Sequence, residues 1–294
     1  MTELFQQIVN SLSLGSIYAL IALGYTMVYG IIKLINFAHG EIYMLGAYTG
    51  YYAMAHLHVN FFVALLLAMI FCTVLGVTIE RIAYRPLRNS TRLAALITAI
   101  GMSLLLQYTT MAIVGPDSRA YPGLPSFMTG SFSVGGVLIK NSQLVIIGVS
   151  VALMVLLQFV VKKTKMGKAM RAVSQDPDAA RLMGISVDRT ISFTFALGSA
   201  LAGAAGVLVG VYYNSINPLM GVLPGLKAFV AAVFGGIGII PGALIGAYVI
   251  GGAETLVSGL GYSLFRDGVV FAILIVVLIV KPTGLLGKNV REKV

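Results

Sequence analysis

The sequence has very little charge. Only 10% of its 294 residues are Asp, Glu, Lys or Arg, whereas 58% are hydrophobic, and the mean hydropathy is +0.94. Soluble domains carry about 25% charged residues. This deficit excludes an ordinary soluble protein and indicates an integral membrane protein. In a bilayer, a chain of this length accommodates roughly eight to ten helical spans of about 20 residues each.

Other scarce residues exclude further classes. The single cysteine, Cys72, lies in an apolar run, so no intramolecular disulfide and no Cys/His metal site is expected. With three histidines and ten acids, we find no convergent group of nucleophile, base or metal ligands for a membrane enzyme. The net charge of +10 is not arranged as a basic stripe with interleaved aromatics, so nucleic acid is not an expected partner. No Lys or Arg precedes the first apolar segment, which argues against a cleaved secretory signal.

Long apolar runs fill most of the chain. Backbone groups in lipid must be hydrogen-bonded internally, so these runs are predicted to be helices. A further apolar region, 226–257, is interrupted by "GGIGIIPG" at 235–242. It is expected to form either a half-span followed by a span or two tilted spans. The predicted spans lie near 11–32, 40–56, 61–80, 93–114, 142–161, 190–212 and 264–280.

Basic residues divide unevenly between the two sides of these spans. Sixteen of the 20 Lys and Arg fall on one side, at Lys33, in loops 81–92 and 162–189 and in the tail 281–294. The positive-inside rule places that side in the cytoplasm. Loop 115–141 then faces outside, as does the N-terminus, and the C-terminus is cytoplasmic. We expect one transmembrane domain over 1–294, with an odd number of crossings. The other four basic residues are Arg119, Lys140, Lys227 and Arg266.

One polar stretch, "RAVSQDPDAARLMGIS" at 171–186, stands out from its apolar surroundings. Asp176 is a suitable N-cap, Pro177 suits the first helical position, and Asp178 complements the helix dipole. Gly184 can take the left-handed conformation that ends a helix. The predicted helix is about two turns, roughly 10 Å, and is marginal alone in water. It could lie on its own membrane domain or dock on a cytoplasmic partner, and the residue pattern leaves both open.

Three blocks of sequence resemble those of known transport proteins. "DAARLMG" at 178–184 resembles the Glu-Ala-Ala-x-x-x-Gly core of the cytoplasmic loop in ABC-importer permeases, with Asp in place of Glu and without the usual Ile-x-Leu-Pro downstream. "SLSLGSIYALIALGYTMVYGIIKLINFAHGEIYMLGAY" at 11–48 and "GLKAFVAAVFGGIGIIPGALIGAYVIGGAE" at 225–254 resemble the N- and C-terminal signatures of branched-chain amino acid permeases. On these blocks the chain is identified as a member of that permease family.

The resemblance implies an all-α, type II-like ABC importer permease of the bacterial inner membrane, with a short cytoplasmic coupling helix. It implies three kinds of partner besides membrane lipid: a homologous permease subunit in a heterodimer, two cytoplasmic ATPases that hold ATP and Mg, and a periplasmic substrate-binding protein. This chain lacks a G-x-x-x-x-G-K-[ST] phosphate loop and is expected to bind no cofactor and to have no enzymatic activity. The residues expected to couple it to the ATPase are Arg171, Asp176, Pro177, Asp178, Ala179, Ala180, Arg181, Met183 and Gly184.

Polar residues within membrane segments are candidates for the translocation path, because a polar group in lipid is costly unless it is paired or hydrated. "INFAHGE" at 35–41 supplies three, although these could instead satisfy helix ends. Glu254 could pair with Lys227 or Arg266, line the path or face the partner. A zwitterionic substrate needs hydroxyls, amides or helix ends, and Ser103 is also available. The candidate path residues are Asn36, His39, Glu41, Thr98, Gln107, Asn214 and Glu254.

The leading functional interpretation is a permease subunit of an ATP-driven importer for Leu, Ile, Val or related neutral amino acids. A permease for urea or short amides and a self-contained secondary transporter remain alternatives. "MLGAY" at 44–48 and "LIGAY" at 244–248 each follow a glycine-containing break. They indicate either an internal repeat of the kind found in transporters or chance similarity of apolar sequence.

Overall fold

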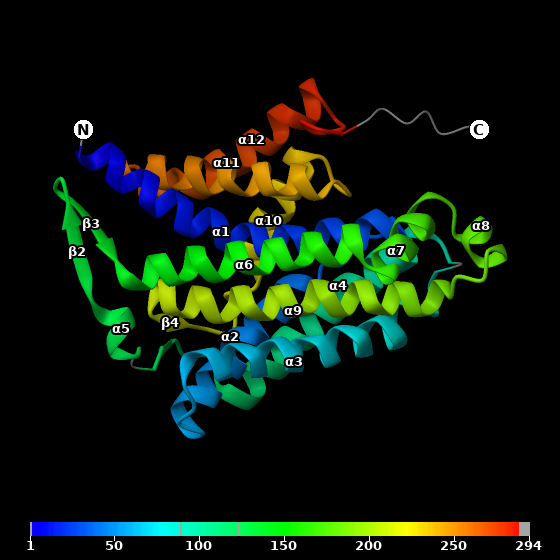
Figure 1. Cartoon of the computed structure of the whole chain (residues 1–294), viewed down its shortest axis with the longest axis horizontal. Coiled ribbons are helices and arrows are strands. Elements are labelled where there is room, and N and C mark those ends of the chain that lie inside the picture. Colours follow the sequence, from blue (N-terminus) through cyan, green and yellow to red (C-terminus); the bar gives the residue numbers. More distant parts are fainter. Residues whose placement is uncertain (1, 89, 123, 288–294) are drawn as a thin grey trace.

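The computed structural model describes residues 2–88, 90–122 and 124–287 (Figure 1). Helices dominate the described chain, as predicted. They are α1 (Thr2–Ile32), α2 (His39–His56), α3 (Phe61–Ile79), α4 (Arg92–Val114), α5 (Ser126–Thr129), α6 (Asn141–Lys163), α7 (Lys165–Gln175), α8 (Pro177–Leu182), α9 (Val187–Tyr213), α10 (Val222–Gly235), α11 (Ile240–Gly259) and α12 (Arg266–Val280). α3 continues into a π-helical turn, η1 (Glu80–Tyr84), and a 3-10 turn, η2 (Ser263–Phe265), precedes α12.

The two ends of the helical bundle differ. One end, which we call the hairpin end, carries an antiparallel hairpin of β2 (Ser131–Val134) and β3 (Val137–Lys140) (Figure 1). The same end holds a short pairing of β1 (Arg119–Ala120) with β4 (Ser215–Ile216). The opposite end, which we call the basic end, carries α7 and α8. The predicted loop 115–141 therefore contains paired strands and the short helix α5.

Seven helical segments in the described residues are long and apolar enough to cross a membrane: α1, α3 with η1, α4, α6, α9, α11, and η2 with α12. Two others are different. α2 has 18 residues and much of it is buried inside the bundle. α10 has 14 residues, about 21 Å of helix, which is shorter than the roughly 30 Å hydrocarbon core. Region 226–257 thus forms a short helix followed by a full-length one, the first of the two predicted arrangements.

α1 and α9 form the centre of the bundle. Within an apolar stretch of 18 residues, 83% of the residues are buried in α1 and in α9, compared with 17% in α4 and 6% in α12. Small residues allow the central backbones to approach closely. A Cβ added to Gly46 of α2 would lie 2.5 Å from the Cα of Gly203 in α9, and one added to Gly198 would lie 3.3 Å from the Cα of Gly24 in α1. The centre is therefore tightly packed, and the outer helices α4 and α12 present large apolar surfaces.

Several predicted boundaries change in the structure. α1 begins at Thr2 rather than near residue 11, because the β2–β3 hairpin supports its polar first turns: Gln6 donates to the carbonyl of Leu138 at 3.0 Å and accepts from its amide at 2.9 Å. Loop 162–189 contains two helices rather than one. The hydroxyl of Thr164 accepts from the amide of Gly167 at 3.0 Å and caps the additional helix, α7.

The chain after α12 folds back onto α10. The amide of Leu285 donates to the carbonyl of Phe234 at 2.8 Å, and that of Leu286 donates to Gly235 at 3.1 Å. The remainder of the predicted basic tail, with Lys288, Arg291 and Lys293, lies outside the described residues.

Candidate functional site

The short polar helix forms as its sequence predicts. The carboxylate of Asp176 accepts from the amides of Asp178 and Ala179 at 2.9 Å each, and Pro177 occupies the first helical position. Gly184 has φ +79°, and the amide of Ile185 donates back to the carbonyl of Ala180 at 3.0 Å. These contacts satisfy backbone groups at both ends, so α8 is a well-capped rod although it has only six residues.

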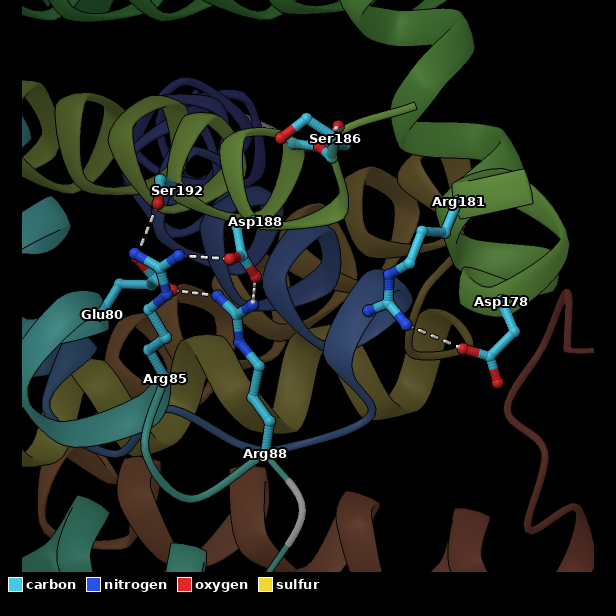
Figure 2. Close-up of polar contacts among 9 residues, drawn as sticks. Glu80, Arg85, Arg88, Asp178, Arg181, Ser186, Asp188 and Ser192 are labelled. Atoms are coloured by element: carbon cyan, nitrogen blue, oxygen red, sulfur yellow. Dashed lines mark hydrogen bonds and ion pairs between the residues drawn. The ribbon is translucent and has the colours of Figure 1, made fainter. Parts of the chain in front are cut away.

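One face of α8 packs inward and the other faces away from the bundle. The side chain of Ala180 is only 4% exposed, whereas Leu182 and Met183 are 88% and 82% exposed. Asp178 and Arg181 form an exposed ion pair at 3.2 Å on the same rod (Figure 2). Two large apolar side chains therefore project from the basic end next to charged groups. Of the two locations that the sequence leaves open for this helix, its own membrane domain receives only Ala180, and Leu182 and Met183 stay exposed.

Arg171 supports α7 and is not on the exposed rod. Its guanidinium donates to the carbonyl of Val161, near the C-terminal end of α6. Gly167 also fits closely there, since an added Cβ would lie 2.2 Å from the same carbonyl oxygen. These contacts fix α7, and through it the start of α8, to a membrane helix.

A cluster of charged side chains lies at the beginning of α9, at the basic end (Figure 2). Asp188, in the first turn of α9, pairs with Arg85 and, at 2.6 Å, with Arg88. Arg88 also pairs with Glu80 of η1, whose other carboxylate oxygen accepts from Ser192 of α9 at 2.6 Å. The cluster ties the segment between α3 and α4 to the beginning of α9.

The sequence reasoning missed this cluster. Arg85 and Arg88 contribute only to the predicted topology, and Glu80 and Asp188 are not among the predicted site residues. A usable signal was present, because Glu80 ends a long apolar run and an unpaired acid there would be costly. The α9 members of the cluster could not be identified from sequence, since Asp188 lies 100 residues beyond Arg88 and Ser192 lies 112 residues beyond Glu80.

The second region of interest is where α2 and α10 begin inside the bundle. Their first turns touch through glycines: a Cβ added to Gly40 would lie 2.4 Å from the carbonyl oxygen of Gly221 and 3.3 Å from the Cα of Gly225. His39 reaches α1 at Gly24, about eight residues, or roughly 12 Å, from the end of α1. Two helices therefore start next to each other within the membrane depth, an arrangement that transporters use for binding sites.

A pocket of about 190 Å³ opens beside these two helix starts. Glu41 of α2 lines it together with Ser103 and Gln107 from the middle of α4. The hydroxyl of Ser103 donates to Oε1 of Glu41 at 3.4 Å, and among the described residues Oε2 has no hydrogen-bond partner. Two of the predicted path residues, Glu41 and Gln107, thus meet in one pocket with the additional residue Ser103.

The other predicted path residues lie elsewhere. Asn36 accepts a 2.9 Å hydrogen bond from the hydroxyl of Tyr84, and His39 packs edge-on against Tyr25 with ring centroids 4.8 Å apart. Thr98 is partly buried on α4 and does not line the pocket. Asn214 is an exposed, left-handed residue that ends α9 at the hairpin end. These four side chains do not join Glu41 and Gln107 in a single site.

Glu254 is held in an ion-pair network. Of the three predicted alternatives, the structure shows pairing with Lys227 and Arg266. Its carboxylate lies 2.8 Å from Nζ of Lys227 and 3.7 Å from Nε of Arg266, and it accepts from the hydroxyl of Tyr18 at 2.7 Å. Lys227 also pairs with Asp267 at 2.6 Å. The network joins α1, α10, α11 and α12, and one side of it borders a polar pocket at the hairpin end.

The remaining candidates for chemistry in the described residues are metal-binding groups and the cysteine. These residues hold no group of three or more His, Cys, Asp or Glu placed to bind a metal ion. Cys72 is buried, with its thiol directed toward the carbonyl of Ile42 at 3.4 Å. The two arrangements that stand out are the exposed rod at the basic end and the pocket between α2, α4 and α10.

Comparison with known proteins decides the family. Residues 7–278 match the model of the family described as branched-chain amino acid transport system, permease component. The chain belongs to this permease family. It is 47% identical to the high-affinity branched-chain amino acid transport system permease protein LivH of Salmonella typhimurium, over 98% of this chain and 97% of the relative.

Further relatives match nearly the full length of the chain. The permease protein BraD of Pseudomonas aeruginosa is 44% identical, over 98% of this chain and 97% of its own. The probable branched-chain amino acid transport permease protein LivH of Methanocaldococcus jannaschii is 29% identical, over 95% of this chain and 91% of its own. Among solved structures, PsaBC from Streptococcus pneumoniae in complex with Fab matches with a TM-score of 0.50 and 13% identity, covering 96% of this chain and 93% of that one. This chain is therefore a multi-pass membrane permease component.

Proposed function

We propose that the protein is the membrane-spanning permease subunit of an ATP-driven importer that carries leucine, isoleucine and valine, or related neutral amino acids, into the cytoplasm. The relatives at 44% and 47% identity are named as branched-chain amino acid permeases, which supports this substrate class. ATP and Mg act at partner ATPase subunits, and this chain moves the substrate.

The observation that carries the proposal is the exposed apolar pair on α8. Leu182 and Met183 project from a rod that is anchored at both ends and closed by a left-handed glycine. Exposed large apolar groups beside charge are typical of protein interaction sites. In the proposed assembly this rod sits in a cleft of the ATPase, and closure of the ATPase moves it.

The movement would reach the membrane helices by two rigid routes. α8 leads within a few residues to α9, the buried centre of the bundle. The Asp188 pairs with Arg85 and Arg88 then connect α9 to the segment that leads into α4, whose middle lines the pocket. Rigid-body displacement of packed elements is an established means of switching. The basic end would face the cytoplasm, with the N-terminus outside and the C-terminus inside.

The assembly proposed around this chain contains a homologous permease subunit in a heterodimer, two cytoplasmic ATPases and a periplasmic substrate-binding protein. The large apolar surfaces of α4 and α12 are available for the second permease subunit and for lipid. The predicted single permease domain over 1–294 is part of this proposal.

The test is uptake by reconstituted vesicles. The assembly is purified with and without its ATPase subunits, and uptake of labelled leucine is measured with and without ATP. We expect uptake only with the ATPase, ATP and the binding protein together. Uptake that persists without ATP and the ATPase would instead establish a secondary transporter. Competition by urea or acetamide, but not by valine or isoleucine, would establish the short-amide alternative.

The coupling role of α8 has its own test. Gly184→Ala places a β-carbon on a left-handed residue, which costs about 1–2 kcal/mol and loosens the end of the rod. We expect uptake to fall roughly tenfold while the protein remains inserted and its ATPase still turns over. Gly148→Ala in α6, where an added Cβ meets nothing within 4 Å, is the matched control. Equal uptake by the two variants would refute the coupling role.

A further inference from the structure

The inference concerns the pocket at the start of α2, and it begins with the state of Glu41. Three glutamates are buried in the described part of the chain: Glu41, Glu80 and Glu254 are 1%, 0% and 2% exposed. Glu80 is paired with Arg88 and Ser192, and Glu254 with Lys227 and Tyr18. Glu41 has only the 3.4 Å contact from Ser103.

Leaving a buried carboxylate without a cation is costly, particularly within a membrane. The fold provides cations for the other two buried glutamates, so Glu41 is the exception in having no cation among the described residues. The unpartnered oxygen Oε2 faces the contact between the two helix starts, because a Cβ added to Gly221 would lie 2.8 Å from it. A cationic group entering the pocket would reach this oxygen.

The rest of the pocket favours a small amphiphile. Gln107 of α4 contributes an amide that can donate to an anion, and the positive end of the α10 dipole begins at Val222. Leu104 and Leu226 supply apolar wall. At about 190 Å³ the pocket is smaller than the roughly 300–1,000 Å³ typical of sites for drug-sized ligands. One acid, one amide donor and an apolar wall match the three parts of an aliphatic α-amino acid.

We propose that this pocket is a substrate subsite in which the carboxylate of Glu41 receives the α-ammonium group of the amino acid. Gln107 and the first turn of α10 face the substrate carboxylate, and Leu104 and Leu226 contact the aliphatic side chain. The glycines Gly40 and Gly221 let the two helix starts approach closely enough to form the floor. This inference rests on the proposed function, since it assigns a place in this chain for the same substrate.

The test measures binding selectivity on the whole complex. The permease and ATPase assembly is placed in nanodiscs without the binding protein, and labelled leucine is displaced by unlabelled leucine or by 4-methylpentanoate, which lacks the ammonium group. In the unaltered complex, leucine should bind at least about tenfold more tightly than 4-methylpentanoate, as expected for a hydrogen bond between charged groups. In Glu41→Gln this preference should fall to about twofold or less, while Glu3→Gln, an exposed acid at the hairpin end, should retain it.

Two further variants keep the test decisive if Glu41→Gln does not assemble. Leu104→Trp fills the pocket from a side chain that is 45% exposed, so the fold should tolerate it, and binding of both ligands should fall at least about tenfold. Gln107→Leu should reduce the preference for leucine over 3-methylbutylamine, which lacks the carboxylate. Unchanged affinity in Leu104→Trp, or unchanged selectivity in Glu41→Gln, would overturn the subsite.

The outcome also separates the subsite from the proposed function. If the unaltered complex takes up leucine with ATP while Glu41→Gln keeps full selectivity, the subsite is wrong and the importer stands. If the unaltered complex shows no ATP-dependent uptake of leucine, isoleucine or valine, the importer proposal itself fails.

Discussion

At the scale of single residues, the buried acids of this protein differ in pairing: Glu254 has a cation at hydrogen-bonding distance, and Glu41 has none among the described residues. Lys227 and Glu254 are 5% and 3% exposed at the side chain and lie 2.8 Å apart; Tyr18 donates a hydrogen bond to Glu254, and Asp267 forms an ion pair with Lys227. A buried pair of this kind adds little net stability as a whole, but removal of one member leaves an uncompensated charge. The network therefore acts as a structural joint of α1, α10, α11 and α12.

Lys227→Met should lower the free energy of unfolding by about 3–5 kcal/mol, because Glu254 then lacks its nearest cation. The double variant Lys227→Met with Glu254→Gln should recover part of that loss. Thermal unfolding followed by circular dichroism in detergent micelles measures both. Lys168→Met, at an exposed position on α7, is the control. A double variant less stable than Lys227→Met would contradict the pairing argument.

At the scale of elements, ion pairs at the basic end join helices that are far apart in the sequence. α8 and α9 are consecutive, and the charged cluster at the basic end connects α9 to η1 and to the start of α4. The members of this cluster differ in burial. The side chain of Glu80 has no exposed surface, whereas Asp188 is 46% exposed. Their contributions to stability should differ accordingly.

Glu80→Gln should lower the free energy of unfolding by about 2–3 kcal/mol, the scale of a lost hydrogen bond to a buried charged group. Asp188→Asn should lower it by only about 0–1 kcal/mol, because water screens an exposed pair. Thermal unfolding of the two variants side by side gives the order. A larger loss in Asp188→Asn would show that the exposed pairs, rather than the buried one, hold η1 to α9.

At the scale of the whole molecule, the two ends of the bundle should face different compartments. The hairpin end carries β2 and β3, and the basic end carries α7 and α8 (Figure 1). Between them the apolar surfaces of α4 and α12 suit lipid or another membrane subunit. This asymmetry of charge along the bundle predicts the topology.

Single-cysteine labelling tests that topology. In a Cys72→Ala background, Ser133→Cys in the exposed hairpin should react with a membrane-impermeant maleimide on intact cells. Gln175→Cys, exposed at the end of α7, should react only after the membrane is opened. Unaltered protein should stay unlabelled, because Cys72 is buried. The reverse pattern would place the basic end outside.

Much of the fold could be predicted because it depends on local pattern. The apolar runs give the long helices, and the order Asp176, Pro177, Gly184 gives α8 with its caps. The predictions failed where a distant segment decided the outcome. α1 is longer than predicted because Gln6 bonds to Leu138, 132 residues away. The sequence leaves open where α8 packs, and the bundle covers only Ala180 beneath it, so Leu182 and Met183 stay exposed.

The sequence alone determined that this is a helical membrane protein with a capped polar rod, because solvation in lipid and helix capping act within a few residues. It also supplied Glu41, Gln107 and Glu254 as polar residues in membrane segments. Only the tertiary structure decided that Glu254 is paired, that Glu41 has no cation among the described residues, and that Glu41 and Gln107 share a pocket. The reason is that pairing depends on which helices pack together, and close contacts at Gly40 and Gly221 join segments 181 residues apart.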